Sequence, residues 1–241
     1  MRPTLFVSDL HLSPARPALL AAFSAFCNGP ARAADAVYVL GDLFDAWIGD
    51  DQLGEPVGAD VARSLRGVSD AGVRVGITRG NRDFLLGERF AQASAGTLLP
   101  EQAVFDVQGT PTLILHGDEL CTDDRSYQKF RAWSHDPTWQ RRWLALPYPV
   151  RRGIARALRR QSRRASAHKP EAIMDVSPDA VAAAFRAHGV ARMVHGHTHR
   201  PARHRTEVDG RECERWVLAD WYDRGSYLEC TPAGIVTREI W

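Results

Sequence analysis

Short runs of Val, Ile, Leu and other apolar residues recur along the chain, and each run ends in a polar residue or in Gly. The runs lie at residues 5–7, 37–40, 73–77, 113–115 and 193–194. Runs that are this short and continuously apolar are typical of central strands in a sheet that is covered on both faces. The pattern therefore predicts buried strands with polar side chains at their ends.

Between these runs lie longer stretches whose apolar residues recur every three or four positions, which indicates helices. These stretches cover residues 18–27, 59–71 and 178–188. The last part of the chain has β-like runs at 216–219, 226–230 and 234–240, separated by turns, which favours an antiparallel end. The predicted fold class is α/β: a two-sheet sandwich flanked by helices.

Composition narrows the class of protein. The chain has 241 residues, of which 44% are hydrophobic and 25% charged, so we expect a soluble globular protein and exclude disorder and coiled coil. The four cysteines are far apart and form no CxxC pair, which favours a reducing cytosol over a disulfide framework. No apolar run is long enough for a membrane span, and no signal peptide is expected.

Neither a linker nor an internal repeat divides the chain, so we predict a single domain over residues 1–241. The polar strand ends are 33 to 39 residues apart as far as His116, but His116 and His197 are separated by 81 residues. This interval is long enough to hold an extra unit. We expect a helical cap inserted at residues 123–170.

The net charge of +2 is unevenly distributed. Residues 141–164 contain nine Arg and no acidic residue, which leaves −7 for the other 217 residues. In the same region Val150, Ile154 and Leu158 recur every four positions, and aromatic residues precede them. A basic amphipathic helix of this kind is typical of a membrane-surface element. Two other interpretations stay open: an apolar stripe packed on the domain beneath a solvated Arg face, and a nucleic-acid surface.

Five short polar motifs follow the predicted strands in order. They are Asp9-x-His11, Gly41-Asp42-x-x-Asp45, Gly80-Asn81-Arg82-Asp83, His116-Gly117-Asp118 and Gly196-His197-x-His199. Each motif alone is more often a turn or a helix cap than a ligand set, but five in series are improbable by chance. They supply carboxylate, amide and imidazole donors without thiolate, which suits Mn²⁺, Fe²⁺ or Zn²⁺. If the strands continue, residues two apart face the same side.

These motifs resemble those of the calcineurin-like metallophosphoesterases (DxH, GDxxD, GNH(D/E), H and GHxH) over about residues 4 to 200. The resemblance implies two divalent metal ions, with Mn²⁺ the expected metal. One would be held by Asp9, His11, Asp42 and His199, and the other by Asp42, Asn81, His116 and His197. Asp42 would bridge the two. We expect Asp45, Asp83 and Asp118 to orient these ligands, unless they are simple caps.

One position departs from the superfamily pattern, because Arg82 stands where a His usually follows the Asn. An Arg is not a general acid near neutral pH, but its planar guanidinium can hold phosphate oxygens and neutralise developing charge. This suits a leaving group that needs little protonation, and so favours a diphosphate linkage over an ordinary phosphodiester. We predict Asn81, Arg82 and His116 as the catalytic residues.

Longer strings around these motifs, such as residues 40–51, 80–87 and 116–124, resemble the UDP-2,3-diacylglucosamine diphosphatases of lipid A biosynthesis. The resemblance implies hydrolysis of that lipid to 2,3-diacylglucosamine 1-phosphate and UMP, by attack of a metal-activated water on the α-phosphorus. It also implies a set of substrate contacts. These are Asn81, Arg82, Asp124, Tyr127, Ser162, Ser166, Lys169 and His197, with Ser166 standing where relatives can carry Asn.

The expected partners are therefore the lipid substrate and an anionic membrane surface, at the cytoplasmic face of the inner membrane. We expect peripheral attachment, no nucleic acid and a monomer. Two other functions stay open: a soluble nucleotide pyrophosphatase or dinucleoside polyphosphate hydrolase, and a non-catalytic binding module. The second is disfavoured because all seven ligand side chains are present.

Overall fold

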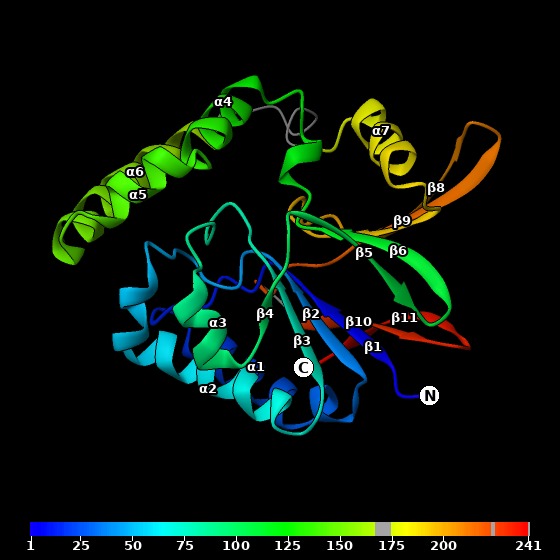
Figure 1. Cartoon of the computed structure of the whole chain (residues 1–241), viewed down its shortest axis with the longest axis horizontal. Coiled ribbons are helices and arrows are strands. Elements are labelled where there is room, and N and C mark those ends of the chain that lie inside the picture. The colour runs from blue at the N-terminus through cyan, green and yellow to red at the C-terminus, as the bar shows by residue number, and fades with distance from the viewer. Residues whose placement is uncertain (167–174, 223–224, 241) are drawn as a thin grey trace.

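The computed structural model describes residues 1–166, 175–222 and 225–240. Two mixed sheets pack face to face, and helices cover their outer sides (Figure 1). This arrangement confirms the predicted two-sheet α/β sandwich. Among the described residues no helix is long and apolar enough to cross a bilayer. All four cysteines are buried free thiols.

The first sheet combines four parallel strands with an antiparallel hairpin at one edge. In spatial order its strands are β11 (Gly234–Glu239), β10 (Ser226–Thr231), β1 (Thr4–Val7), β2 (Ala36–Leu40), β3 (Arg74–Thr78) and β4 (Thr97–Leu98). The hairpin formed by β10 and β11 confirms two of the three runs of the predicted antiparallel end. The third run, at 216–219, overlaps β9 (Arg211–Val217) of the second sheet, which pairs with one neighbour in parallel and with the other antiparallel. Strands β1, β2 and β3 run in the same direction, so their carboxyl ends share one edge of the sheet.

The second sheet has three parallel strands flanked by an antiparallel strand on each side. Its order is β5 (Gln102–Val107), β6 (Thr110–Leu115), β7 (Arg192–His195), β9 (Arg211–Val217) and β8 (Ala202–Val208). The sequence pattern predicted β6 and β7 but missed β5 and β8.

Alternating side chains of the central strands enter two different cores. Phe6 and Tyr38 lie between the two sheets, where their rings stack 5.3 Å apart. Leu5, Val7 and Val37 face the helices instead. Because each strand buries both of its faces, its sequence is apolar at every position, as the short runs predicted.

Four helices form the outer layers. α1 (Pro17–Asn28), α2 (Pro56–Ser69) and α3 (Glu88–Ser94) cover the first sheet, and α7 (Pro178–His188) covers the second (Figure 1). α1, α2 and α7 each have Pro in their first turn, where the missing amide hydrogen removes no helical bond. Short 3-10 turns lie at η1 (Pro30–Ala33), η2 (Asp50–Gly54) and η3 (Asp118–Leu120).

Three further helices, α4 (Arg125–Ser134), α5 (Pro137–Leu144) and α6 (Tyr148–Ser166), extend from the edge of the molecule between β6 and α7 (Figure 1). We refer to them as the helical arm. Asp124 and Asp136 cap α4 and α5 by accepting a backbone amide in the first turn, which fixes where each helix begins.

Candidate metal and phosphate site

The predicted ligands lie in the loops that follow the parallel strands, and their backbone is unusual. Eight non-glycine residues of the described chain have positive φ, and five of these are predicted ligands: Asp9, His11, Asp42, His197 and His199. β1 ends at Val7 and β7 at His195, before these residues. The expected same-face alternation along a continuing strand is therefore wrong. Left-handed turns bring the side chains together instead, and such strained backbone is often found at functional sites.

Backbone contacts hold two of these loops side by side. The amide of Asp9 donates to the carbonyl of Gly41 over 3.1 Å, and the amide of His11 donates to the carbonyl of Asp42 over 2.9 Å. Gly80 lies directly against Asp42, where a Cβ atom would come within 2.3 Å of Oδ1. A side chain at position 80 would therefore push Asp42 out of place.

One end of the site is formed by Asp9, His11 and His199. His199 Nε2 lies 3.2 Å from Asp9 Oδ1 and 3.4 Å from His11 Nε2. His11 Nδ1 is buried without a hydrogen bond and lies 3.8 Å from Asp42 Oδ2. A buried imidazole nitrogen that faces a carboxylate at more than hydrogen-bonding distance fits a position beside a shared cation.

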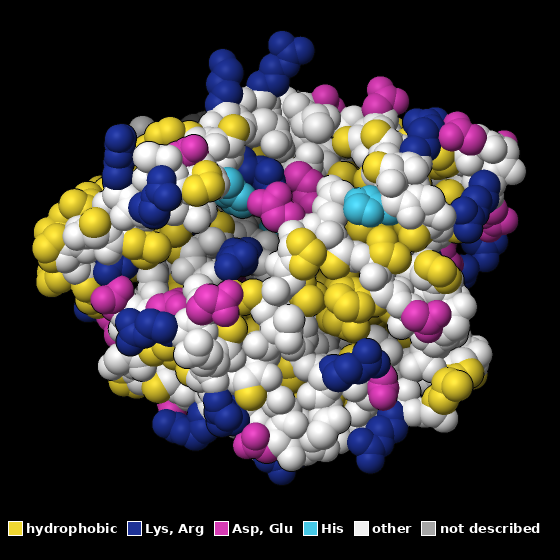
Figure 2. Space-filling model, in the orientation of Figure 1, with side chains coloured by type: hydrophobic (Ala, Val, Ile, Leu, Met, Phe, Trp, Pro, Cys, Tyr) yellow, Lys and Arg dark blue, Asp and Glu magenta, His cyan; other side chains and the backbone are white. Residues whose placement is uncertain are grey.

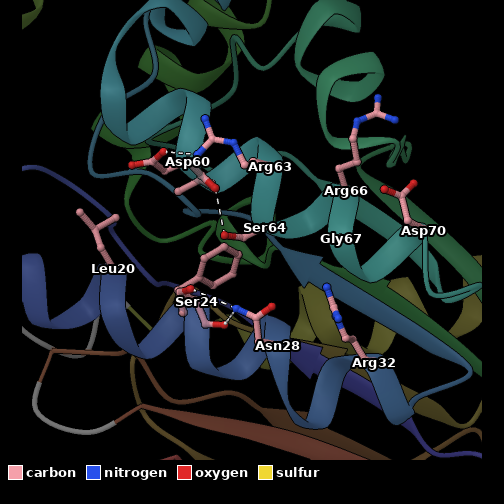
Figure 3. A pocket seen from close by; sticks show the side chains of 12 residues that line it. Leu20, Ser24, Asn28, Arg32, Asp60, Arg63, Ser64, Arg66, Gly67 and Asp70 are labelled. Atoms are coloured by element: carbon pink, nitrogen blue, oxygen red, sulfur yellow. Dashed lines mark hydrogen bonds and ion pairs between the residues drawn. The ribbon is translucent and has the colours of Figure 1, made fainter.

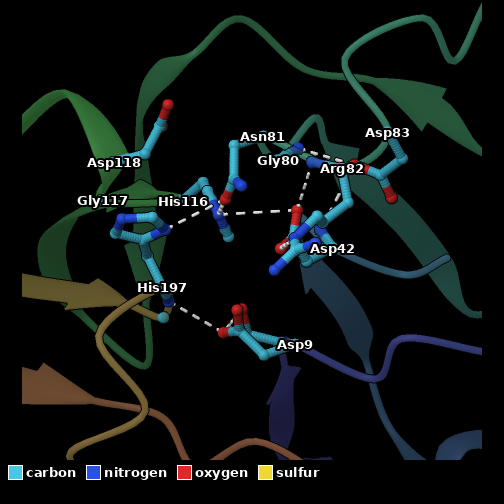
Figure 4. Close-up of polar contacts among 12 residues, drawn as sticks. Asp9, Asp42, Gly80, Asn81, Arg82, Asp83, His116, Gly117, Asp118 and His197 are labelled. Atoms are coloured by element: carbon cyan, nitrogen blue, oxygen red, sulfur yellow. Dashed lines mark hydrogen bonds and ion pairs between the residues drawn. The ribbon is translucent and has the colours of Figure 1, made fainter. Parts of the chain in front are cut away.

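The other end is formed by Asp42, Asn81, His116 and His197 (Figure 4). Asn81 Oδ1 lies 3.1 Å from both His116 Nε2 and His197 Nδ1, and Asp42 Oδ1 lies 3.7 Å from His116 Nε2. The two oxygens of Asp42 thus face the two ends of the site. The structure brings together all seven predicted ligands, which we call the ligand cluster.

Burial and charge shift the ionisation of the ligand cluster. Burial raises the pKa of Asp42 to about 7. Burial works against protonation of His116, but the charges of Asp42 and Asp9 prevail and raise its pKa to about 9. Burial lowers the pKa of His11 to about 3 and that of His197 to about 4, so both are neutral imidazoles that can donate to a metal.

Neighbouring groups orient the ligands. His116 Nδ1 lies 2.8 Å from the carbonyl of Leu40, which directs Nε2 into the site. The Asp83 carboxylate accepts the amides of Leu43 at 2.8 Å and Gly80 at 2.7 Å, so Asp83 organises the loops, as expected for an orienting group. Asp45 pairs with Arg159 of α6.

Asp220 is a functional residue that the sequence reasoning missed. Its Oδ2 lies 2.7 Å from His199 Nδ1. Burial opposes protonation of His199, but hydrogen bonds with Asp220 and Asp9 raise its pKa to about 10. The available signal was an acidic residue directly after the β-like run at 216–219. His195, which the sequence reasoning did not assign as a ligand, contacts Arg215 at 2.9 Å instead.

Arg82 lies at the mouth of the site. Its amide donates to Asp42 Oδ1 over 2.8 Å, and its Nε is buried without a hydrogen bond. About a third of its side chain is exposed. Because Nε lies 3.8 Å from Asp42 Oδ2, the partly exposed guanidinium lies beside the ligand cluster, which suits the predicted contact with phosphate oxygens.

The first turn of α4 brings two predicted substrate contacts to the His197 end. The Tyr127 ring stacks on His197 with centroids 6.0 Å apart, and its hydroxyl donates to the Asp118 carboxylate. Asp124 caps α4 by accepting the amide of Tyr127 over 3.0 Å. The side chains of Ser162 and Ser166, which belong to α6, and all of Lys169 lie outside the described residues.

The helical arm exposes its apolar residues. Large apolar side chains that are more than a third exposed include Phe130, Trp133, Leu144, Leu146, Val150, Ile154 and Leu158. In Figure 2 hydrophobic side chains gather at the left, where Figure 1 places the arm. The interpretation in which the apolar stripe packs on the domain is therefore wrong.

Two arginines of the arm pair with acidic groups of the domain, and one of them, Arg151, is buried. Arg151 is only 2% exposed and donates to the carbonyl of Ile48 over 2.6 Å and to Asp51 over 2.5 Å. Arg152 lies 3.3 Å from Glu55. The amphipathic helix is confirmed, but the expectation that its arginines form the outer, headgroup-facing side is wrong for Arg151, which is buried against the domain.

A groove of about 550 Å³ lies between α1 and α2 (Figure 3). It contains none of the predicted site residues. Its Arg63 pairs with Asp60 at 2.7 Å, and Arg66 donates to the carbonyl of Ala93. The groove is therefore separate from the ligand cluster.

Comparison with known proteins agrees with the geometry. The sequence profile of the family "Calcineurin-like phosphoesterase" matches residues 2–201. A UDP-2,3-diacylglucosamine hydrolase of Cellvibrio japonicus is 46% identical over 235 residues, covering 98% of each chain. A protein of the same name from Shigella sonnei is 49% identical over 228 residues, covering 95% of each.

Among solved structures, TT1561 of Thermus thermophilus matches the fold with a TM-score of 0.50 at 13% identity, covering 100% of this chain and 99% of its own. The profile covers most of the chain, and the relatives are similar along nearly their whole length. This chain thus belongs to the calcineurin-like phosphoesterase family and, within it, to the family of proteins named UDP-2,3-diacylglucosamine hydrolase.

Proposed function

We propose that this protein hydrolyses the diphosphate bond of UDP-2,3-diacylglucosamine to give 2,3-diacylglucosamine 1-phosphate and UMP. The observation that carries the proposal is the ligand cluster with Arg82 at its mouth, in a chain nearly half identical to hydrolases named for that substrate. The donors fit a dinuclear site, and we propose two Mn²⁺ ions, one at each end. When bound, such ions activate water and stabilise charge on a phosphoryl group.

The side chains of the protein have separate roles in this reaction. Asp42 lies between the two ends, with one carboxylate oxygen toward His11 and the other toward His116. Asn81 holds its amide oxygen between His116 and His197. Arg82 binds the phosphoryl oxygens and neutralises their charge as it grows. No general acid is required, because the leaving group is a phosphate monoester of low basicity.

We infer that the helical arm, within a cap at residues 123–170, receives the acyl chains and the membrane. Its exposed aromatic and aliphatic residues support this inference, because contiguous apolar surface marks a lipid or protein contact. The enzyme would then act as a peripheral protein, and as a monomer, at the cytoplasmic face of the inner membrane. A purely soluble nucleotide pyrophosphatase has no use for this surface.

The deciding experiment is turnover of UDP-2,3-diacylglucosamine by the Mn²⁺-loaded protein in ¹⁸O-labelled water. We expect the label in UMP, which corresponds to attack on the α-phosphorus. Label in the lipid phosphate would move the attack to the other phosphorus. Turnover of water-soluble UDP-sugars at the same rate as the lipid would contradict the proposed substrate.

A further inference from the structure

Tyr222 covers the His11 end of the ligand cluster. It lies between β9 and β10, next to Trp221, which is fully buried and donates its ring N–H to the carbonyl of Ser226 over 2.9 Å. The amide of Trp221 also donates to the carbonyl of Asp9 over 3.2 Å. With the Asp220 contact to His199 on its other side, Trp221 fixes this stretch against the cluster.

The Tyr222 ring joins a stack of planar groups. It lies 5.1 Å from the ring of His11 at an interplanar angle of 22°, and the guanidinium carbon of Arg16 lies 4.0 Å from its centroid. Tyr222 is 37% exposed. Among the described residues the Arg16 side chain makes no hydrogen bond or ion pair, so its N–H donors are available to a ligand.

The backbone holds Arg16 in this position before any ligand arrives. Arg16 precedes Pro17, the first residue of α1, and the proline disfavours a helical backbone at Arg16, whose φ is −130° and ψ is 67°. The amide of Arg16 donates to the carbonyl of Ser13 over 3.1 Å, and its own carbonyl accepts the amide of Leu19. A guanidinium held in this way loses little freedom when a planar group binds to it.

Two tyrosines therefore mark the two ends of the ligand cluster. Tyr127 stacks on His197 at the end where the helical arm begins, and Tyr222 stacks on His11 at the other. Burial raises the pKa of Tyr222, and the charges of Arg82 and Arg16 act against this shift. A diphosphate placed over the cluster would leave one of its substituents at each tyrosine.

The proposed substrate has a different group on each phosphate: an acylated sugar on one and uridine on the other. The helical arm, to which the proposed function assigns the acylated sugar, begins at the Tyr127 end. The nucleoside is then directed to the opposite end. Its uracil is a flat, polarised ring, and bases of this kind stack on arginine guanidinium planes and on aromatic side chains.

We propose that Arg16 and Tyr222 form the binding site for the uridine half of the substrate, with uracil stacked on the face of the Arg16 guanidinium that is turned away from Tyr222. This inference rests on the proposed function. In it Tyr222 positions Arg16, and Arg16 contacts the base, so both act in binding rather than in bond cleavage.

The test compares two ligands that differ only in the base. UMP and ribose 5-phosphate are titrated separately into Mn²⁺-loaded protein by calorimetry. We expect the wild type to bind UMP more tightly than ribose 5-phosphate, and Arg16→Ala to reduce that ratio about fivefold or more. Arg16→Lys keeps the positive charge but lacks the planar guanidinium, and we expect it to lower the affinity ratio by the same amount. Tyr222→Phe keeps the ring and should keep the ratio.

Arg63→Ala is the matched control, because Arg63 is an exposed arginine in the separate groove, and its ratio should equal that of the wild type. The metal content of each variant is measured, since Tyr222 touches His11. If Arg16→Ala or Arg16→Lys has the same ratio of UMP affinity to ribose 5-phosphate affinity as the wild type, the proposed uracil site is wrong. The binding ratio does not depend on turnover, whereas a wild type that binds UMP selectively but leaves the lipid intact would count against the proposed function alone.

Discussion

The ligand cluster and the helical arm bury opposite kinds of residue. In the ligand cluster, Asp9 and Asp42 are almost fully buried and held by left-handed backbone turns. In the arm, apolar side chains such as Trp133 and Val150 are exposed, while Arg151 is buried. Each region thus departs from the usual arrangement of apolar residues inside and charged residues outside.

The difference shows how each region is stabilised without its ligand. The loops and side chains of the ligand cluster are held by neighbouring carboxylates. Asp83 accepts hydrogen bonds from backbone amides, and Asp220 contacts the His199 ring. The arm relies on pairs between its arginines and acidic groups of the domain, as between Arg151 and Asp51. Each region still has groups that can bind a further partner. In the ligand cluster these are side chains that can hold a cation, and in the arm they are exposed apolar side chains.

The largest expected effect is loss of the ligand cluster. Asp42→Ala or His116→Ala removes one of the proposed metal ligands, which face each other in the site. We expect the rate of UMP release to fall by at least about a thousandfold. Release is measured with UDP-2,3-diacylglucosamine and Mn²⁺. Circular dichroism and metal analysis follow the fold and the loading. Near-normal turnover in either variant with metal bound would contradict the dinuclear assignment.

A smaller effect is expected from the apolar surface of the arm. In the variant Ile154→Gln with Leu158→Gln, two exposed apolar side chains are lost, and binding to vesicles that contain phosphatidylglycerol should fall about tenfold or more. Val236→Gln on β11 is the matched control, because Val236 is 43% exposed and lies outside the arm. Co-sedimentation measures the binding. If both variants lose vesicle binding to the same extent, the arm is not the part of the surface that binds the membrane.

The smallest effect concerns the link between the regions. Arg131 of α4 lies 2.9 Å from the buried Asp118 carboxylate, so Arg131→Ala removes the cation that pairs with that charge. We expect the free energy of unfolding to fall by about 3 kcal/mol. Arg186→Ala removes a pair with Asp209 in which both side chains are exposed, and its effect should be too small to resolve. Urea unfolding compares the two. Similar losses would mean that the buried contact adds nothing.

The fold was largely predictable because the central strands bury both faces. Continuous apolar runs identified β1, β2, β3, β6 and β7, and helical spacing identified α7 with its bounds. β8 escaped prediction because it is a mostly exposed edge strand whose residues are polar. Such a strand has no alternation of apolar and polar residues that would distinguish it from a loop. It is held in the sheet by its backbone pairing with β9.

The site was predictable as a set of motifs but not as a geometry. The residue types in the motifs were enough to predict the seven ligands. The left-handed turns at Asp9 and His197 were not predictable, because residues other than Gly seldom adopt positive φ. Asp220 and Tyr222 were missed because neither belongs to a motif. They flank Trp221, whose ring packs against Phe23 and Phe26 of α1. The inward direction of Arg151 likewise depends on Asp51, which lies 100 residues earlier.

The contact between Asp9 and His199 joins residues that are 190 positions apart, and each comes from a different sheet. Contacts of such long range close late in folding, because much of the chain must be ordered before they can form. A nascent chain that lacks its last third therefore cannot assemble the His199 end.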